Sequence, residues 1–146
     1  MKNFQFGIIG PHPFGKGTIG EFALHIECPW RIVSSEGIVT GSADYYEPVE
    51  ARAEVDANDS HTGNLQQKRL GDLLGSYDAS TRSWVNSRAE LTVQSVRVDD
   101  FGGFDLEFSG GLLLQVFPDG SREENWRFFA PGSEEEHVVI AGGRAK

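Results

Sequence analysis

The stretch FALHIEC, residues 22–28, decides the fold because its apolar side chains recur at every second position. Phe22, Leu24, Ile26 and Cys28 would share one face of an extended strand, and the residues between them would share the other. The proline that follows lacks an N–H for a ladder hydrogen bond, so we expect a bend before the strand resumes.

From about residue 90 onward the sequence predicts a meander of five further strands. Short runs of glycine, proline, aspartate and serine separate them, as is typical of turns between antiparallel strands. Parallel neighbours would need crossover helices, which this part of the sequence does not offer. In chain order the segments are LTVQSVRV (91–98), FDLEF (104–108), LLLQVF (112–117), ENWRFF (124–129) and HVVIAG (137–142).

Only the segment at about 64–77 predicts a helix. Asn64 is a good N-cap, leucines follow at spacings of three and four, and Gly75 stands near the end. Together these patterns predict a mainly β fold, an antiparallel rolled sheet or small barrel of about eight to nine strands with one helix. The length of 146 residues favours a single domain spanning 1–146.

The charge of the chain limits its partners. Thirteen Lys and Arg against 22 Asp and Glu give a net charge of −9. Binding to nucleic acid or to an anionic membrane needs clustered cations, so we expect neither partner. A small ligand or a basic protein remains a candidate partner, and a homodimer through exposed sheet edges is another.

The single cysteine, Cys28, excludes an internal disulfide and a zinc site built of thiolates. Its position on the apolar face of FALHIEC predicts a buried thiol with an ordinary or raised pKa. The sequence shows neither a leader pattern nor a long apolar run, so we expect a cytoplasmic protein.

The segment GPHPFGKGT, residues 10–18, has the spacing of a phosphate-binding loop. Such a loop needs backbone N–H groups that converge on phosphate at the start of a helix. Pro11 and Pro13 each remove one N–H, and the strand-like FALHIEC follows soon after Lys16. We therefore expect a connection between two strands, with a nucleotide-binding enzyme that uses Lys16 as the weaker alternative.

Neither a metal site nor a hydrolytic triad is indicated. The four histidines are far apart in the sequence and never paired at ligand spacing, and no G-x-S-x-G motif occurs. We therefore expect no catalytic residues, no metal and no cofactor.

Two Trp-Arg pairs, in CPWRIV and ENWRFF, are the best candidates for a binding site. Neighbours on a strand face opposite sides, so tryptophans in the core would leave the arginines outside. In a curled sheet one or both arginines would line the mouth with nearby aromatic groups, forming a pocket for an anionic or aromatic ligand. The alternative is that the tryptophans only fill the core and the arginines pair with surface carboxylates. The candidate ligand-binding residues are His25, Trp30, Arg31, Tyr45 and Arg127.

The segments ALHIECPWRIV, DYY and FSGGLLLQVFPDGSREENWRFFAP resemble a family of small uncharacterised bacterial proteins. Members of that family carry an L-H-x-x-C-P-W-R strand followed by S-G-G, F-P-D-G and W-R-x-F/Y segments. The resemblance spans about residues 22 to 143, apart from the polar middle. It implies a bacterial β-rich protein and no particular activity.

We therefore expect a non-enzymatic β domain that binds a ligand or a protein. An immunity-type protein that neutralises a toxin is an alternative suggested by small size and acidity alone. The nucleotide-binding enzyme is the second alternative.

Overall fold

The computed structural model describes residues 1–15, 17–50, 63–78, 80–81, 83–85 and 91–146, and it is mainly β. Within these residues, one α-helix and two 3-10 helices accompany the strands. The strands are β1 (Lys2–Phe6), β2 (Gly10–Pro11), β3 (Thr18–Ile19), β4 (Phe22–Ile26), β5 (Trp30–Ser34), β6 (Gly37–Gly41), β7 (Ser76–Asp78), β8 (Ser83–Val85), β9 (Val93–Val98), β10 (Phe104–Phe108), β11 (Leu112–Val116), β12 (Glu124–Phe129), β13 (Val138–Ala141) and β14 (Arg144–Ala145). The helices are η1 (Ser42–Tyr46), α1 (Leu65–Leu74) and η2 (Ser109–Gly111).

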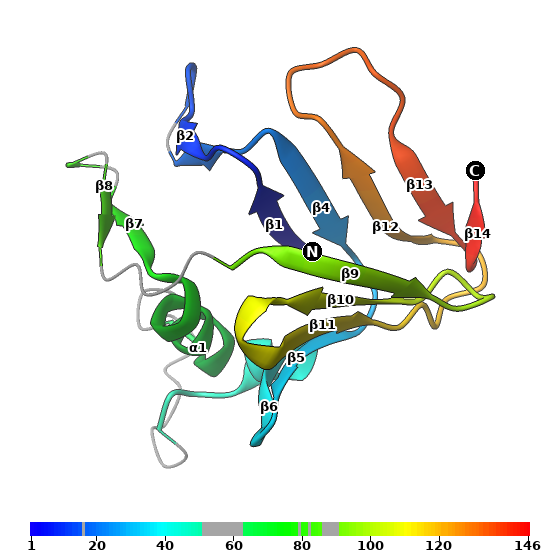
Figure 1. Cartoon of the computed structure of the whole chain (residues 1–146), viewed down its shortest axis with the longest axis horizontal. Coiled ribbons are helices and arrows are strands. Elements are labelled where there is room, and N and C mark those ends of the chain that lie inside the picture. The colour runs from blue at the N-terminus through cyan, green and yellow to red at the C-terminus, as the bar shows by residue number, and fades with distance from the viewer. Residues whose placement is uncertain (16, 51–62, 79, 82, 86–90) are drawn as a thin grey trace.

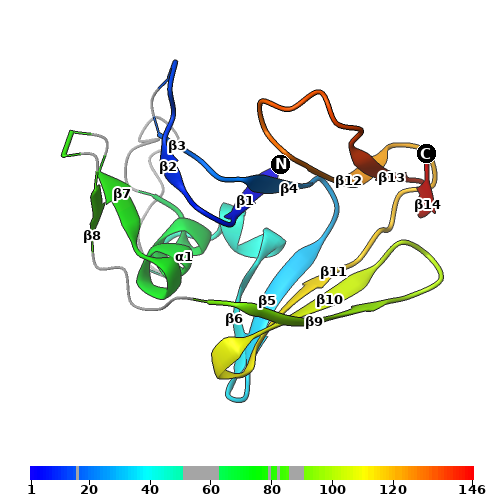
Figure 2. The same cartoon turned by 45° about the horizontal axis from the view of Figure 1, so that its top comes forward.

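Two five-stranded antiparallel sheets form the body of the protein (Figure 1). Sheet I has the order β1-β4-β12-β13-β14, and sheet II has the order β6-β5-β11-β10-β9. The pairs β2-β3 and β7-β8 form two small separate ladders. Figure 2 shows that the two large sheets diverge from the β4–β5 connection, like the covers of a partly opened book.

The chain passes from sheet I to sheet II at Cys28 and Pro29. The N–H groups of Glu27 and Cys28 both donate to the carbonyl of Asn125, at 2.8 and 3.2 Å, and Phe117 N–H donates to the carbonyl of Pro29 at 2.9 Å. These bonds satisfy the backbone where the β4 ladder stops. The bend expected at the proline is therefore the corner that joins the two sheets.

The core fills the space next to this corner. Trp30 is 4% exposed and meets the ring of Phe4 edge to face, with centroids 5.3 Å apart. Ile26 of sheet I and Leu114 of sheet II are each 1% exposed. The apolar face of FALHIEC therefore packs inward from Leu24 to Cys28, whereas Phe22 remains 42% exposed at the far end of β4.

The prediction of a mainly β, antiparallel fold with one α-helix is confirmed for the described residues. These residues form fourteen strands, more than the eight to nine expected, and nine of the fourteen have four or more residues. The closed-barrel alternative is wrong because the two large sheets stay separate. The five late strands also do not form one meander. After β11 the chain crosses to sheet I, where β12 pairs with β4 and β13. Strand β12 therefore pairs with the distant strand β4 and not with β11, its neighbour in the sequence.

Helix α1 begins where the sequence predicted, since the side chain of Asn64 accepts a hydrogen bond from Gln67 N–H at 2.9 Å. It ends at Leu74, earlier than predicted. Gly75 has a φ of 82°, which most side chains disfavour, and Ser76 already belongs to β7. The helix lies against β6 at one edge of sheet II.

Candidate functional site

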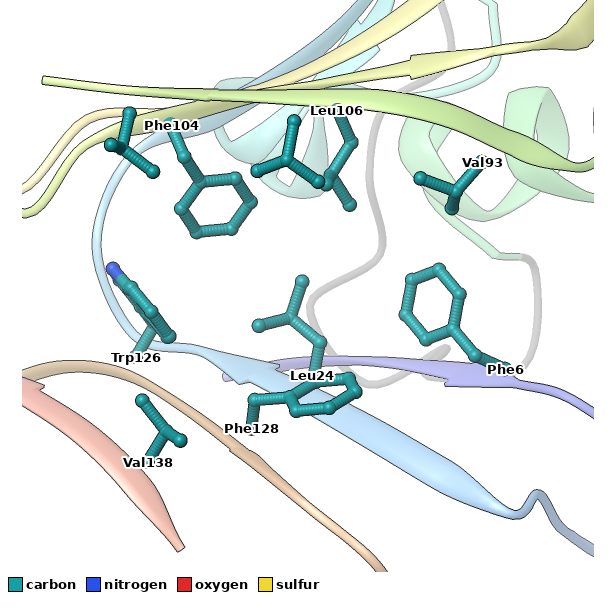
Figure 3. A pocket seen from close by; sticks show the side chains of 10 residues that line it. Phe6, Leu24, Val93, Phe104, Leu106, Trp126, Phe128 and Val138 are labelled. Carbon is teal, nitrogen blue, oxygen red and sulfur yellow. The ribbon is translucent and has the colours of Figure 1, made fainter.

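The strongest candidate site is a groove of about 450 Å³ between the diverging halves of the two sheets. Figure 3 shows side chains from both sheets pointing toward one another across this space. Pockets that bind small molecules fall in the range of roughly 300–1,000 Å³. The lining residues are Phe6, Leu24, Val93, Val96, Val98, Phe104, Leu106, Trp126, Phe128 and Val138.

Strand pairing places the two walls of the groove. In sheet II, Leu106 on β10 lies opposite Val96 on β9. In sheet I, Phe128 on β12 lies opposite Leu24 on β4, so their side chains share the inner face. The period-two alternation of each strand thus turns every second side chain toward the groove.

All of the lining side chains are apolar except for one indole nitrogen, that of Trp126. This Nε1–H already donates to the carbonyl of Gly102 at 2.7 Å. The Trp126 ring also packs edge to face on Phe104, with centroids 5.0 Å apart. The groove therefore offers hydrophobic contact and no free hydrogen-bond partner from its lining side chains, which suits an apolar group.

The rim of the groove is open to solvent. Val96 is 59% exposed, Val98 73% and Val138 52%. Phe128, 36% exposed, stacks on Phe22 with ring centroids 5.5 Å apart. Adjoining exposed apolar side chains of this kind are typical of interaction surfaces.

A second cluster lies on the outer face of sheet I, away from the groove. His25 on β4 is directly opposite Arg127 on β12. The guanidinium of Arg127 donates to Glu124, with Nε 2.6 Å from Oε1, and lies 3.2 Å from His137 Nδ1. Phe129 is stacked on the ring of His137 and meets the ring of His25 at its edge.

The charges of this cluster are internally balanced. Burial lowers the pKa of His25, and the neighbouring positive charge of Arg127 lowers it further. The hydrogen bond from Arg127 lowers the pKa of the Glu124 carboxyl. Arg127 therefore already has a carboxylate partner, which is what we expected if the arginines only pair with surface carboxylates. This pairing leaves less of the Arg127 charge for an anionic ligand.

The five sequence-predicted ligand residues do not form one pocket. Only His25 and Arg127 come together. Trp30 is buried in the core, and Arg31 lies on sheet II, where its Nε donates to Gln115 Oε1 at 2.8 Å and its guanidinium lies 5.2 Å from the ring centre of Phe117. Tyr45, 54% exposed in η1, contacts the ring of its neighbour Tyr46.

In chain order, the described parts of the segment 10–18 lie between strands β1 and β4, where the sequence predicted a connection; Lys16, on which the nucleotide-binding alternative depends, lies outside the described residues. The ends of the segment pair as the short ladder β2-β3, with Pro11 opposite Thr18. His12 N–H donates to the carbonyl of Gly17 at 3.1 Å. The next element after this ladder is β4, a strand, whereas a phosphate-binding loop leads into a helix.

Cys28 is 7% exposed, and burial raises the pKa of its thiol to about 11. The prediction of a buried thiol is confirmed. Because the thiolate is the reactive form, this cysteine is a poor nucleophile near neutral pH. Within the described residues, His, Cys, Asp and Glu side chains nowhere gather in a group of three or more that would hold a metal ion.

The groove residues were missed because alternation marks the inward side of a strand and does not show whether another strand faces it. The one available signal is VQSVRV (93–98), in which valines occur without any larger apolar residue. Valines are small, so a strand whose apolar residues are all valines can leave space between two sheets. The distance between the sheets, however, does not follow from the sequence.

Comparisons with models of protein families, with curated proteins and with solved structures gave no match. The resemblance to small bacterial proteins therefore remains a prediction. Within the part of the chain that the structure describes, no helix has the length and apolar character needed to cross a membrane.

Proposed function

We propose that the protein is a non-enzymatic binding domain that takes an apolar group of its ligand between sheets I and II. The observation that carries this proposal is the open groove, whose lining is apolar and whose single indole N–H is already bonded. Such a site gains free energy by removing apolar surface from water, at roughly 25 cal/mol per Å².

The geometry favours binding over catalysis. A catalytic site needs a nucleophile, acid or base within reach of the bound reactant, and the described groove lining has none. The polar cluster of His25, Glu124 and Arg127 lies on the opposite face of sheet I. A reactant in the groove would therefore be separated from it by the sheet.

The test uses a neutral apolar dye, N-phenyl-1-naphthylamine, whose fluorescence rises in apolar surroundings. We expect saturable binding of about one dye per chain. Val96→Glu places a charge at the groove rim and should weaken binding at least tenfold, because a carboxylate in apolar surroundings is costly.

Ile38→Glu is the matched control, because Ile38 is 60% exposed on β6, the opposite edge strand of the same sheet. This variant should bind the dye as the unchanged protein does. Absence of saturable dye binding, or equal weakening by both variants, would reject the groove as the binding site.

A further inference from the structure

Among the described residues, strand β9 is an uncovered edge of sheet II. Its Val93 to Val98 are all exposed, and β10 is its only strand partner among the described residues. A bulge interrupts the pairing near Val93, but Ser95 to Val98 are in regular register with β10. An edge strand presents a row of unpaired N–H and C=O groups that can pair with another chain.

The other three edges of the large sheets carry protective features. On β6, Gln66 Nε2 donates to Gly41 O and Arg69 Nη1 donates to Val39 O, both at 3.0 Å, so helix α1 covers that edge. Strand β14 has only two residues. On β1, Lys2 is directly opposite buried Ile26, and an inward charge disfavours pairing with another strand.

The free edge and the open groove are continuous. Val96 and Val98 belong both to the edge strand and to the groove lining. A strand added next to β9 would turn every second side chain to the same side as these valines, toward the groove. Backbone bonds would supply affinity, and the groove would select apolar side chains at alternate positions.

The charges beside the rim define the rest of the occupant. Asp99 and Asp100 directly follow Val98, and Glu134 to Glu136 lie just before Val138 in the sequence; all five carboxylate residues are exposed. Neither flanking run, DDFGG or GSEEE, contains Lys or Arg. Arg97, the one cation of β9, alternates with Val96 and Val98, so it belongs to the other face of the strand, where it lies opposite Asp105. The whole chain carries −9. Basic residues on either side of an apolar strand would therefore complement the rim.

A second copy of this chain is a poorer occupant. It would bring the same Asp99-Asp100 turn and another net charge of −9 to the same edge. Like charges brought together at an interface oppose association.

From these observations we infer that β9 and the groove together bind an extended segment of a basic partner protein, which adds a strand to sheet II. The segment carries apolar side chains at alternate positions and Lys or Arg at its flanks. This inference rests on the proposed function of the groove and specifies its ligand.

The test measures fluorescence anisotropy of a labelled peptide, Lys-Val-Thr-Val-Thr-Val-Lys, titrated with the full chain. We expect saturable binding and displacement of N-phenyl-1-naphthylamine. The same peptide with glutamates in place of both lysines should bind at least tenfold more weakly at low salt, and the difference should shrink as salt is added.

Two peptides with N-methyl groups on alternate residues test the backbone pairing. In one of these peptides the methyl groups block the N–H groups that would face β9, and its affinity should fall at least tenfold. The other peptide should keep more of the affinity of the parent peptide. Equal binding by both methylated forms and the parent would overturn strand addition. Equal binding of lysine and glutamate peptides would overturn the charge assignment.

Two other results separate this inference from the proposed function. Dye binding without any peptide binding would overturn the inference and leave the apolar groove as the binding site. Light scattering that shows a dimer, dissociated by Val96→Glu but not by Ile38→Glu, would assign the edge to a second copy and overturn the basic partner.

Discussion

The two ends of the space between the sheets differ although both are lined by the same kinds of residue. Near the β4–β5 corner, Ile26, Leu114 and Val116 are at most 2% exposed. At the far end, Val96 and Val98 are 59% and 73% exposed. Alternation assigns a side chain to a face of its sheet, whereas the separation of the two sheets decides whether that face is buried.

The largest expected difference is in stability. Leu114→Ala should lower the free energy of unfolding by about 2–5 kcal/mol, because it removes a buried side chain and leaves a cavity. Val98→Ala should change it by no more than about 0.5 kcal/mol, since most of the side chain is already in water. Urea denaturation measures both, and similar losses would contradict the contrast between the two ends.

Thiol chemistry provides a second contrast. Cys28 should react with iodoacetamide at about pH 8 at least tenfold more slowly than a cysteine introduced as Val98→Cys in a Cys28→Ala background, because it is buried and has little thiolate. Comparable rates in the folded protein would contradict burial at the corner.

The raised pKa of Cys28 also gives an alkaline prediction. The unfolded thiol ionises near pH 8.5, whereas the folded thiol stays protonated until about pH 11. The unfolded state therefore loses its proton first, and this contribution to stability declines as pH rises through that window. Cys28→Ala should show a smaller decline in the urea midpoint over the same range.

The smallest expected effect concerns the outer face of sheet I. Because the folded pKa of His25 is lowered, the neutral form is favoured in the folded state, and stability should fall as pH drops below about 6.5. We expect a loss under about 1 kcal/mol, the scale of partly exposed charge interactions.

Urea midpoints at about pH 7.5 and pH 5.5 measure this change while carboxyl groups such as Glu124 stay largely ionised in the unfolded chain. His25→Gln should reduce it, and dye binding in the groove should stay the same throughout. An equal loss of stability in His25→Gln would assign the acid sensitivity to another group.

The sequence could predict the strands and the start of the helix because those features depend on local chemistry. The alternation of FALHIEC, the turn residues and the cap at Asn64 each act over a few positions. The separation of Arg31 from Arg127 onto different sheets could not be predicted, because it depends on which distant strands pair. For the same reason, the late strands were expected in one meander although the structure divides them between two sheets.

The candidate site was less predictable than the fold. His25 and Arg127 were singled out individually, and their meeting across β4 and β12 follows from a register between residues about a hundred positions apart. The groove depends on something still less local, which is how far sheet I lies from Val96 and Val98 of sheet II; both valines line the groove and are 59% and 73% exposed.

The most direct test of the open groove is the effect of a neutral, soluble nitroxide on methyl NMR signals. We expect strong broadening of the signals of Val96, Val98 and Val138 and little broadening of those of Leu114 and Val116. If the rim valines were as protected as Leu114, the sheets would be closed over the groove and the account would be contradicted.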